Sequence, residues 1–466
     1  MGIVLSVLYL GIDCMSAGYV LGPLMAYHVQ LILVALALLS SIPALIKSSI
    51  LKTPQTFALI GLTGAVFLSR FLENHYLTGA LFGLEAFIPS ALAYFLICLH
   101  GTTKRRLQVI VIMMFSVCLL IIVHGFSDLI HDVANSGPPP GVGIDAPTEG
   151  GATASPYLMR QSNGEGGWNY RLQGLGEIND PNDFGQLQVC LLPLLFMFWR
   201  PKKTMRNFAL VIIPACVLLF GLFLTHSRGA LLALMAVLIV AGRRRIGTIP
   251  SVALASCLFL GAMALQFTGG RQISASAGED RTALWGEAIA IFRAHPLSGV
   301  GYGNLGEFTE NHLTAHNSII VCAAETGLFG FYLWSLFLYP TIRNAYSIAS
   351  PEKVTESGVS PPDEGPFPRA IRKIEKLDKD EINRLGRLVF LSLIGFLVTG
   401  WFLSRAFVVT LFLLGGMVES IYQMALQRGM ISPRPPFMKV LRSSAGLAIC
   451  LMTALYIVIR ILNMSR

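Results

Sequence analysis

Residues 107–127 read L-Q-V-I-V-I-M-M-F-S-V-C-L-L-I-I-V-H-G-F-S, an apolar run that begins directly after the basic triplet K-R-R at 104–106. A helix needs about 20 mostly apolar residues to cross the hydrocarbon core of a bilayer. Runs of similar length recur along the 466 residues, of which 54% are hydrophobic and only 13% charged. Soluble proteins carry roughly a quarter charged residues. This chain therefore has too little charge to cover a water-soluble surface.

The pattern predicts an all-α fold, a polytopic membrane helical bundle of about 12 transmembrane helices. We expect residues 1–466 to form a single integral membrane domain. The sequence offers thirteen candidate ranges, near 3–21, 26–46, 56–71, 82–100, 107–127, 184–199, 207–225, 229–242, 248–267, 318–341, 387–403, 406–425 and 441–462. The first is interrupted by Asp13, Ser16 and Gly18, and 229–242 is short, so we expect 12 spans, give or take one.

The formal net charge of +9 has a topological explanation rather than a nucleic-acid one. Basic residues gather in short loops around 47–52, 104–106, 200–206, 243–245 and 428–442, and none of these clusters includes an acidic residue. Short loops rich in Lys and Arg mark the cytoplasmic side of a membrane protein. Nucleic acid is therefore not an expected partner.

Alternation from these basic loops predicts the sides of three longer loops. Loop 128–183 is expected on the external, periplasmic side, and its Gly- and Pro-rich stretch 136–167 predicts partial disorder. Loop 268–317 is also external and carries the catalytic motifs described below. Within it, positions 284, 285, 288, 291 and 292 are apolar at the spacing of one helical face, which predicts a helix along the membrane surface. Loop 346–386 is expected to be cytoplasmic.

Four polar clusters fall on the predicted external side, each beside a span. They are R-L-Q-G-L-G-E-I-N-D-P-N-D (171–183), T-H-S-R-G (225–229), R-T-A-L-W through H-P-L-S-G-V-G-Y-G (281–303), and A-H-N-S-I-I-V-C-A-A-E-T-G-L-F-G (315–330).

In these clusters the chain resembles the bacterial O-antigen ligase superfamily, which includes related polysaccharide polymerases. That family carries His, then Asn, Ser or Gln, then nine residues, then Gly-x-x-Gly, and His316, Asn317, Gly327 and Gly330 match this pattern. The T-x-S-R-G at a helix end, the surface helix with Arg and Trp, and the H-P-L-x-G-V-G turn extend the resemblance over roughly residues 171–330.

The resemblance implies a fold similar to C-type glycosyltransferases and a glycosyltransferase of lipopolysaccharide biosynthesis in the bacterial inner membrane. It would move a glycan from a polyprenyl diphosphate carrier to a hydroxyl of a lipid A–core acceptor at the periplasmic face. The glycosyl–phosphate bond of such a donor is already activated, and the sequence contains no P-loop for a nucleotide. No cofactor and no metal site are expected, because arginines would neutralise the leaving diphosphate.

His316 is the candidate general base, because an imidazole accepts a proton near neutral pH. Asn317 would orient the His316 ring or the substrate, or serve only as a helix cap. His312 is a candidate for substrate binding, and a solvated loop histidine is the simpler interpretation. As a residue taken alone, His316 would also be a water-satisfied helix-end histidine; the motif reverses that preference.

Arg228 and Arg281 are the candidate catalytic cations, because a guanidinium binds phosphate oxygens in a fork. Arg171 and Asn182 are candidates for substrate binding. The simpler alternatives are a helix-end arginine that reaches for the membrane surface at 228, a polar-face residue at 281 and a loop solubiliser at 171. Asn182 follows Asp180 and Pro181, a pair typical of a helix start.

Three other functions compete with the ligase. A polymerase would use a second lipid-linked repeat unit as its acceptor, and a protein O-glycosyltransferase would use a protein hydroxyl. A transporter or flippase belongs to a different class and should carry charged or helix-breaking residues near mid-membrane. The predicted spans are nearly free of charge, which favours an enzyme that works at the membrane surface.

Overall fold

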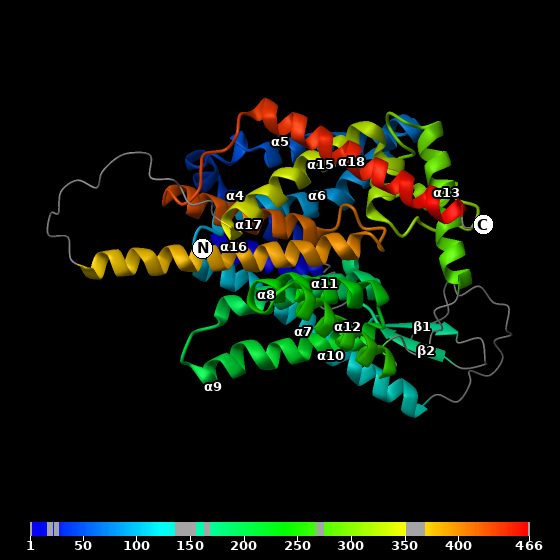
Figure 1. Ribbon diagram of the computed structural model, residues 1–466. Helices are drawn as coiled ribbons and strands as arrows, with labels where there is room; N and C mark the ends of the chain where they lie inside the picture. The colour runs from blue at the N-terminus through cyan, green and yellow to red at the C-terminus, as the bar shows by residue number, and fades with distance from the viewer. Residues whose placement is uncertain are drawn as a thin grey trace. The chain divides into compact units, whose positions relative to one another are not determined.

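The computed structural model describes residues 2–15, 22, 28–135, 155–162, 168–265, 267, 275–350 and 369–464 (Figure 1). The disorder predicted for 136–167 falls largely on residues 136–154 and 163–167, which lie outside this part of the chain. The first half of the predicted cytoplasmic loop 346–386 also lies mostly outside it.

The fold is confirmed as all-α and polytopic. Where the structure describes the chain, a helix covers at least part of each predicted span, because a backbone in hydrocarbon must satisfy its hydrogen bonds within its own segment. In the first predicted span, 3–21, the described helix ends at Cys14. The helices are α1 (Gly2–Cys14), α4 (Val29–Lys47), α5 (Pro54–Asn74), α6 (Leu77–His100), α7 (Lys104–Asn135), α8 (Pro181–Leu195), α9 (Thr204–Asn207), α10 (Ile213–Thr225), α11 (Arg228–Ile246), α12 (Thr248–Ala264), α13 (Ala275–Ala294), α14 (Leu305–Phe308), α15 (Ser318–Ala349), α16 (Arg369–Gly400), α17 (Val409–Gln427) and α18 (Phe437–Met464).

Within the described residues, nine helices are long and apolar enough to cross a membrane. Two shorter apolar helices, Gly2–Cys14 and Thr248–Ala264, accompany them. The predicted spans at 184–199 and 229–242 correspond to α8 and α11. The 15-residue α8 is short for a span, and α11 ends in three consecutive arginines. Short 3-10 turns are η1 (Ile50–Lys52), η2 (Gly176–Ile178) and η3 (Phe196–Phe198), and η4 (Phe208–Ile212) is a π-helix.

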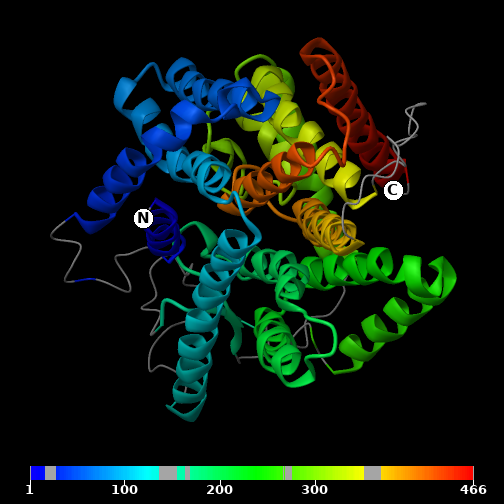
Figure 2. The ribbon, with the colours of Figure 1, turned by 90° about the vertical axis from the view of Figure 1, so that its left-hand side faces the viewer.

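The chain folds into two compact units. The first unit comprises segments 1–6, 37–107 and 274–466, and the second comprises 7–36 and 108–273. Figures 1 and 2 show their helices in two views.

Helix α15 is the centre of the first unit, where it packs against α5, α16, α17 and α18. Nearly every residue from Ser318 to Gly327 is buried, and so is most of the rest of the helix. A helix that is apolar on all sides is typical of an interior position. The residues that precede α15 therefore stand at the end of the most constrained element of this unit.

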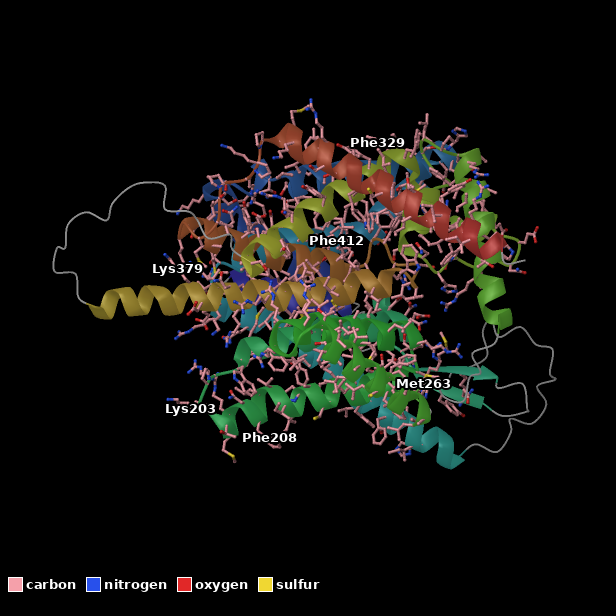
Figure 3. The ribbon with its side chains drawn as sticks, viewed as in Figure 1. Lys203, Phe208, Met263, Phe329, Lys379 and Phe412 are labelled. Atoms are coloured by element: carbon pink, nitrogen blue, oxygen red, sulfur yellow. The ribbon has the colours of Figure 1, made fainter. Side chains whose placement is uncertain are left out.

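Aromatic side chains form the core beside α15. The ring of Phe412 on α17, labelled in Figure 3, lies 5.1 Å from that of Phe337 on α15 and 5.7 Å from that of Phe87 on α6. All three side chains are fully buried. Such aromatic pairs contribute roughly 0.5–1.5 kcal/mol each beyond the area that they bury.

The second unit is built on α7, α8, α10, α11 and α12, with α8 packed against both α10 and α11. Loop 128–183, in which the stretch 136–167 was predicted to be partly disordered, contains an antiparallel hairpin of β1 (Leu158–Ser162) and β2 (Trp168–Leu172). Figure 1 shows the two strands side by side, and β2 contacts α10. Burial raises the pKa of Tyr157 at the start of the hairpin, and the nearby Asp128 carboxylate raises it further.

Candidate active site

His316 lies directly before α15 in a backbone conformation that is unusual for a side-chain-bearing residue. Its φ is +46°, in the left-handed region that only a few per cent of non-glycine residues adopt. Its backbone N–H donates to Oγ of Ser404 at 2.8 Å, and the side chain is half-buried. Residues held in such conformations cluster at functional sites.

Asn317 caps α15. Its Oδ1 accepts hydrogen bonds from the backbone N–H groups of Ile319 at 3.0 Å and Ile320 at 3.2 Å. Its Nδ2 donates to the carbonyl of Trp401 at 3.1 Å, and the side chain is fully buried. Both ends of the amide are used within the protein, which supports the capping interpretation over direct contact with substrate.

Ser404, in the segment 401–408 between α16 and α17, is the residue of the site that sequence reasoning missed. The hydroxyl of Ser404 accepts a hydrogen bond from the backbone N–H of His316. It also forms a hydrogen bond with the hydroxyl of Thr314 at 2.6 Å. The letters W-F-L-S-R at 401–405 match no catalytic motif. The available signal was weaker: a polar serine and an arginine between two apolar spans at the predicted external end.

Helix α13 is anchored to the same place. The indole Nε1 of Trp285 donates to the carbonyl of Ala315 at 2.7 Å, one residue before His316. The Trp285 ring also meets the Trp401 ring edge-to-face, with centroids 6.4 Å apart. Arg281 is exposed and lies four residues before Trp285 on α13, so one helical turn separates it from this anchor. His312 is exposed in the preceding loop, with a φ of +53°.

The H-P-L-S-G-V-G-Y-G segment (295–303) fits into a break in α15 at Gly327. There φ is +64° and ψ is −170°, a combination that is essentially restricted to glycine. The break frees backbone groups that the segment satisfies: Leu328 N–H donates to Pro296 at 2.8 Å and Val300 N–H to Ala324 at 2.9 Å. A Cβ at Gly327 would overlap the carbonyl of Leu297. Gly327, the first glycine of the Gly-x-x-Gly pattern, thus allows the 295–303 segment to bind to the central helix.

Arg70 and Glu325 brace this segment from two sides. Arg70 donates from Nε to the carbonyl of Tyr302 at 2.5 Å and from Nη2 to Oδ1 of Asn304 at 2.7 Å. The buried carboxylate of Glu325 accepts backbone N–H bonds from Gly303 and Leu305. Glu73, three residues after Arg70 on α5, lies with its Oε2 3.4 Å from Nδ1 of His295, the first residue of the segment.

In the second unit, Arg171, Asn182 and Ser227 form one hydrogen-bonded group. Arg171 on β2 donates from Nε to the carbonyl of Thr225 at 3.0 Å and from Nη2 to Oδ1 of Asn182 at 3.1 Å. The same Oδ1 accepts from Oγ of Ser227 at 2.8 Å. Arg171 is only 5% exposed. The group therefore ties the hairpin to the start of α8 and to the α10–α11 turn.

Arg228 is the first residue of α11, directly beyond this group. The turn before it has His226 in a left-handed conformation and Ser227 as the N-cap, whose Oγ accepts from the N–H of Ala230 at 3.3 Å. A helix N-terminus carries a partial positive charge, and a cation there is unfavourable unless an anion is present. With Arg171 close by, the start of α11 is a positive pole suited to phosphate oxygens.

The predicted residues thus fall into two groups, one in each unit. Arg171, Asn182 and Arg228 share the positive pole at the α10–α11 turn, and Asp180 caps α8 by accepting from the N–H of Asn182 at 2.7 Å. Arg281, His312, His316 and Asn317 belong to the entrance of α15. Among the described residues, no group of three His, Cys, Asp or Glu side chains could hold a metal ion.

Residues 184–335 match a family model described as O-antigen ligase. The matched segment includes the α10–α11 turn, the start of α15 and the Gly327 break. No curated protein matches the chain. The family match confirms the resemblance to O-antigen ligases and supports a ligase-like or polymerase-like function for a multi-pass membrane protein.

Proposed function

We propose that this member of the O-antigen ligase-like superfamily is a glycosyltransferase of the inner membrane that moves a glycan from a polyprenyl diphosphate carrier to a hydroxyl of a lipid A–core sugar. The observation that carries the proposal is the held, left-handed His316 at the entrance of the central helix, inside the family match. A half-buried imidazole on a backbone that is held in place suits proton abstraction from an acceptor.

In the proposed step, the His316 imidazole takes the proton of the acceptor hydroxyl. The acceptor oxygen then attacks the anomeric carbon of the donor sugar, and a new glycosidic C–O bond forms. The C–O bond between that carbon and the diphosphate breaks, and its electron pair leaves with the lipid diphosphate. Each atom is accounted for without a nucleotide or a redox partner.

Cationic side chains stabilise the leaving diphosphate in this proposal. Arg228 supplies a guanidinium at the start of α11, where the backbone dipole adds to its charge. Arg281 supplies a second, exposed guanidinium one turn from the Trp285 anchor. Arg171 contributes mainly by holding the turn, because two of its N–H groups already bond Thr225 and Asn182. With these cations the reaction is proposed to be metal-independent.

The proposed active side is periplasmic. The span Thr204–Thr225 begins next to Lys202 and Lys203 and ends at the turn that contains Arg228. Its 22 residues correspond to about 33 Å of helix, close to the thickness of the hydrocarbon core. If the basic end is cytoplasmic by the positive-inside rule, the Arg228 end faces the periplasm.

The buried carboxylates within the spans support an enzyme over a transporter. Glu325 is used to hold the 295–303 segment. Glu419 accepts from Gln423 at 2.7 Å and from Arg434. Both charges have structural partners, whereas a translocation path would present them to a substrate.

The test is reconstitution of purified protein with a polyprenyl-diphosphate-linked repeat unit and a lipid A–core acceptor, with glycolipid products separated on a gel. Glycan on the core, made by wild type and absent with His316→Ala, would support the ligase. A lengthening ladder on the polyprenyl carrier with an unmodified core would identify a polymerase instead. Failure of folded protein to use either acceptor, with carrier moved across the vesicle membrane, would favour a flippase.

A further inference from the structure

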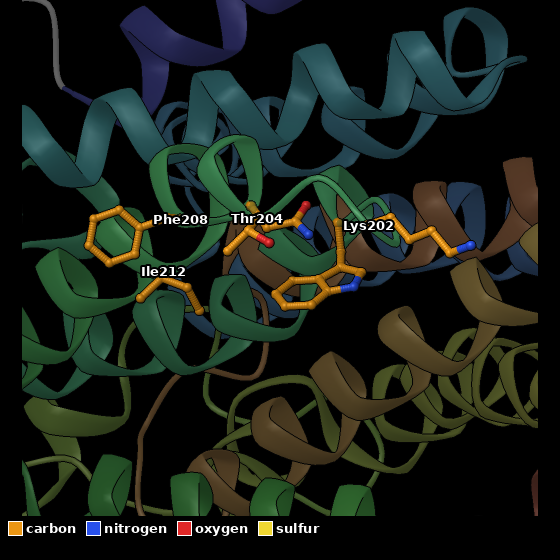
Figure 4. Close-up of a pocket in the computed structure, with 6 residues that line it drawn as sticks. Lys202, Thr204, Phe208 and Ile212 are labelled. Carbon is orange, nitrogen blue, oxygen red and sulfur yellow. The ribbon is translucent and has the colours of Figure 1, made fainter.

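A pocket of about 200 Å³ lies in the second unit at the end of the Thr204–Thr225 span away from Arg228. Figure 4 shows Lys202 toward one end of the pocket, Phe208 and Ile212 toward the other, and Thr204 between them. Trp199 and Asn207 complete its lining. The pocket therefore has a cationic, hydroxyl-bearing end and an apolar end.

The polar end is held in place by Asn207. This side chain is 5% exposed; its Oδ1 accepts from the N–H of Arg200 at 2.8 Å and its Nδ2 donates to the carbonyl of Arg200 at 2.7 Å. Lys202, two residues after Arg200, has a left-handed backbone with φ of +63°. Such a conformation persists in a lysine only when the surrounding structure enforces it. The loop thus presents Lys202 from a fixed backbone.

The charge around the pocket is one-sided. Residues 184–265 contain no acidic residue, so the basic residues at 200–206 have no carboxylate within this stretch of sequence. Arg206 adds a further cation, and its Nη1 is buried with no hydrogen-bond partner among the residues that the structure describes. A cationic surface of this kind attracts a fixed anion.

The apolar end lies on exposed side chains of the span. Phe208 is 55% exposed and Ile212 is 37% exposed. Both belong to the π-helix η4, a feature that occurs frequently at functional sites. Trp199, also partly exposed, is of the residue type enriched where hydrocarbon meets headgroups. A ligand in this pocket would contact both a cationic side chain and apolar side chains.

We propose that this pocket is a binding site for an anionic phospholipid, separate from the reaction site. The headgroup phosphate would lie at Lys202 and Thr204, and an acyl chain would lie along Phe208 and Ile212. Lipid-binding pockets with basic residues at the cytoplasmic side of a bundle follow the same chemistry. The lipid-linked donor is a poor occupant, because its diphosphate is assigned to the α11 pole at the other end of the span.

The test uses the fluorescence of Trp199 in vesicles that contain phosphatidylglycerol or phosphatidylcholine with brominated acyl chains, which quench nearby indoles. The chain has five tryptophans, so the Trp199 signal is taken as the difference between wild type and Trp199→Phe. We expect about fivefold preferential quenching by the anionic lipid, the size of one basic contact at a membrane surface. Lys202→Gln should abolish the preference and Lys202→Arg should keep it.

Lys203→Gln is the matched control, because it removes the same charge one residue away from a side chain that does not line the pocket. Equal quenching of the Trp199 signal by the two lipids would overturn the proposal, and this comparison requires only the conservative Trp199→Phe variant to fold. If Lys203→Gln lost the preference for anionic lipid equally, that preference would come from general surface charge and not from this pocket. Loss of the preference in millimolar inorganic phosphate would reassign the pocket to a soluble anion.

Discussion

The backbone N–H of His316 donates to the side-chain oxygen of Ser404 at 2.8 Å, across 88 residues of chain. The bond joins the residue before the central helix α15 to the loop between α16 and α17. It holds the backbone of His316 through its N–H group. Ser404 is therefore a positioning residue in the proposed mechanism.

Replacement of Ser404 by alanine should lower kcat by about ten- to a hundredfold, the size of effect expected when a reacting group is displaced by roughly 1 Å. The KM for the donor should change little, because the diphosphate contacts are assigned to other residues. Ser404→Thr keeps the hydroxyl and should restore most of the activity. Steady-state kinetics of the three proteins give the answer, and full activity in Ser404→Ala would remove Ser404 from the mechanism.

His316→Ala should lower kcat by about 10²–10⁴, the usual contribution of a general base. His312→Ala provides a comparison within the same loop. Because His312 is exposed, its loss should at most raise the KM for the acceptor. Initial rates at varied acceptor concentration separate the two effects. A His316→Ala protein that folds and retains kcat would mean that another group removes the proton.

Arg228→Lys should raise the KM for the donor about tenfold or more, because lysine keeps the charge and loses the guanidinium fork. A hydrogen bond to a charged group is worth roughly 1.5–3 kcal/mol, and 1.4 kcal/mol corresponds to a tenfold change. Arg245→Lys is the control at the other end of the same helix and should leave the KM unchanged. An equal KM for the donor in the two variants would contradict the assignment of Arg228 to donor binding.

Gly327→Ala should destabilise the protein by at least about 1–3 kcal/mol, because alanine cannot adopt the backbone of Gly327 without strain. Its Cβ would also displace the loop at Leu297. Gly286→Ala is the matched substitution: it lies in α13 and its Cβ would meet nothing within 4 Å. There the helix propensity of alanine should stabilise the protein by roughly 0.5–1 kcal/mol. Thermal unfolding in detergent should therefore shift in opposite directions.

Glu419→Gln should cost about 1–3 kcal/mol of stability, because it removes the anion from the Arg434 guanidinium, whose side chain is 19% exposed. Glu419 is 2% exposed and also bonds Gln423. The paired replacement Glu419→Gln with Arg434→Gln should recover part of the loss. Glu307→Gln, at an exposed carboxylate, should have little effect. Strict additivity of the two single changes in a double-mutant cycle would show that the pair is not coupled.

The membrane class, the approximate positions of the apolar helices and the polar clusters beside them could be read from the sequence. Hydrocarbon forces the backbone to satisfy its own hydrogen bonds, so a continuous apolar run has one regular solution, the helix. The helix caps could also be predicted, because each depends on residues that are close in sequence. Asp180 and Asn317 bond N–H groups two or three residues away, and that distance is visible in a short stretch of sequence.

Only the tertiary structure decided which of these local features act together. The hydrogen bond from His316 to Ser404 spans 88 residues and the one from Arg171 to Thr225 spans 54. No periodic sequence pattern predicts either of them. The β1–β2 hairpin was hidden in a loop of low hydrophobicity. The role of Gly327 was likewise undecided, because small residues serve equally for close helix packing. A periodic pattern reports on the face of one element, whereas these contacts depend on how separate elements dock. Sequence therefore determined the apolar helices and the candidate residues, and the docking of separate elements decided which side chains bond within the protein, as those of Arg171 and Asn317 do.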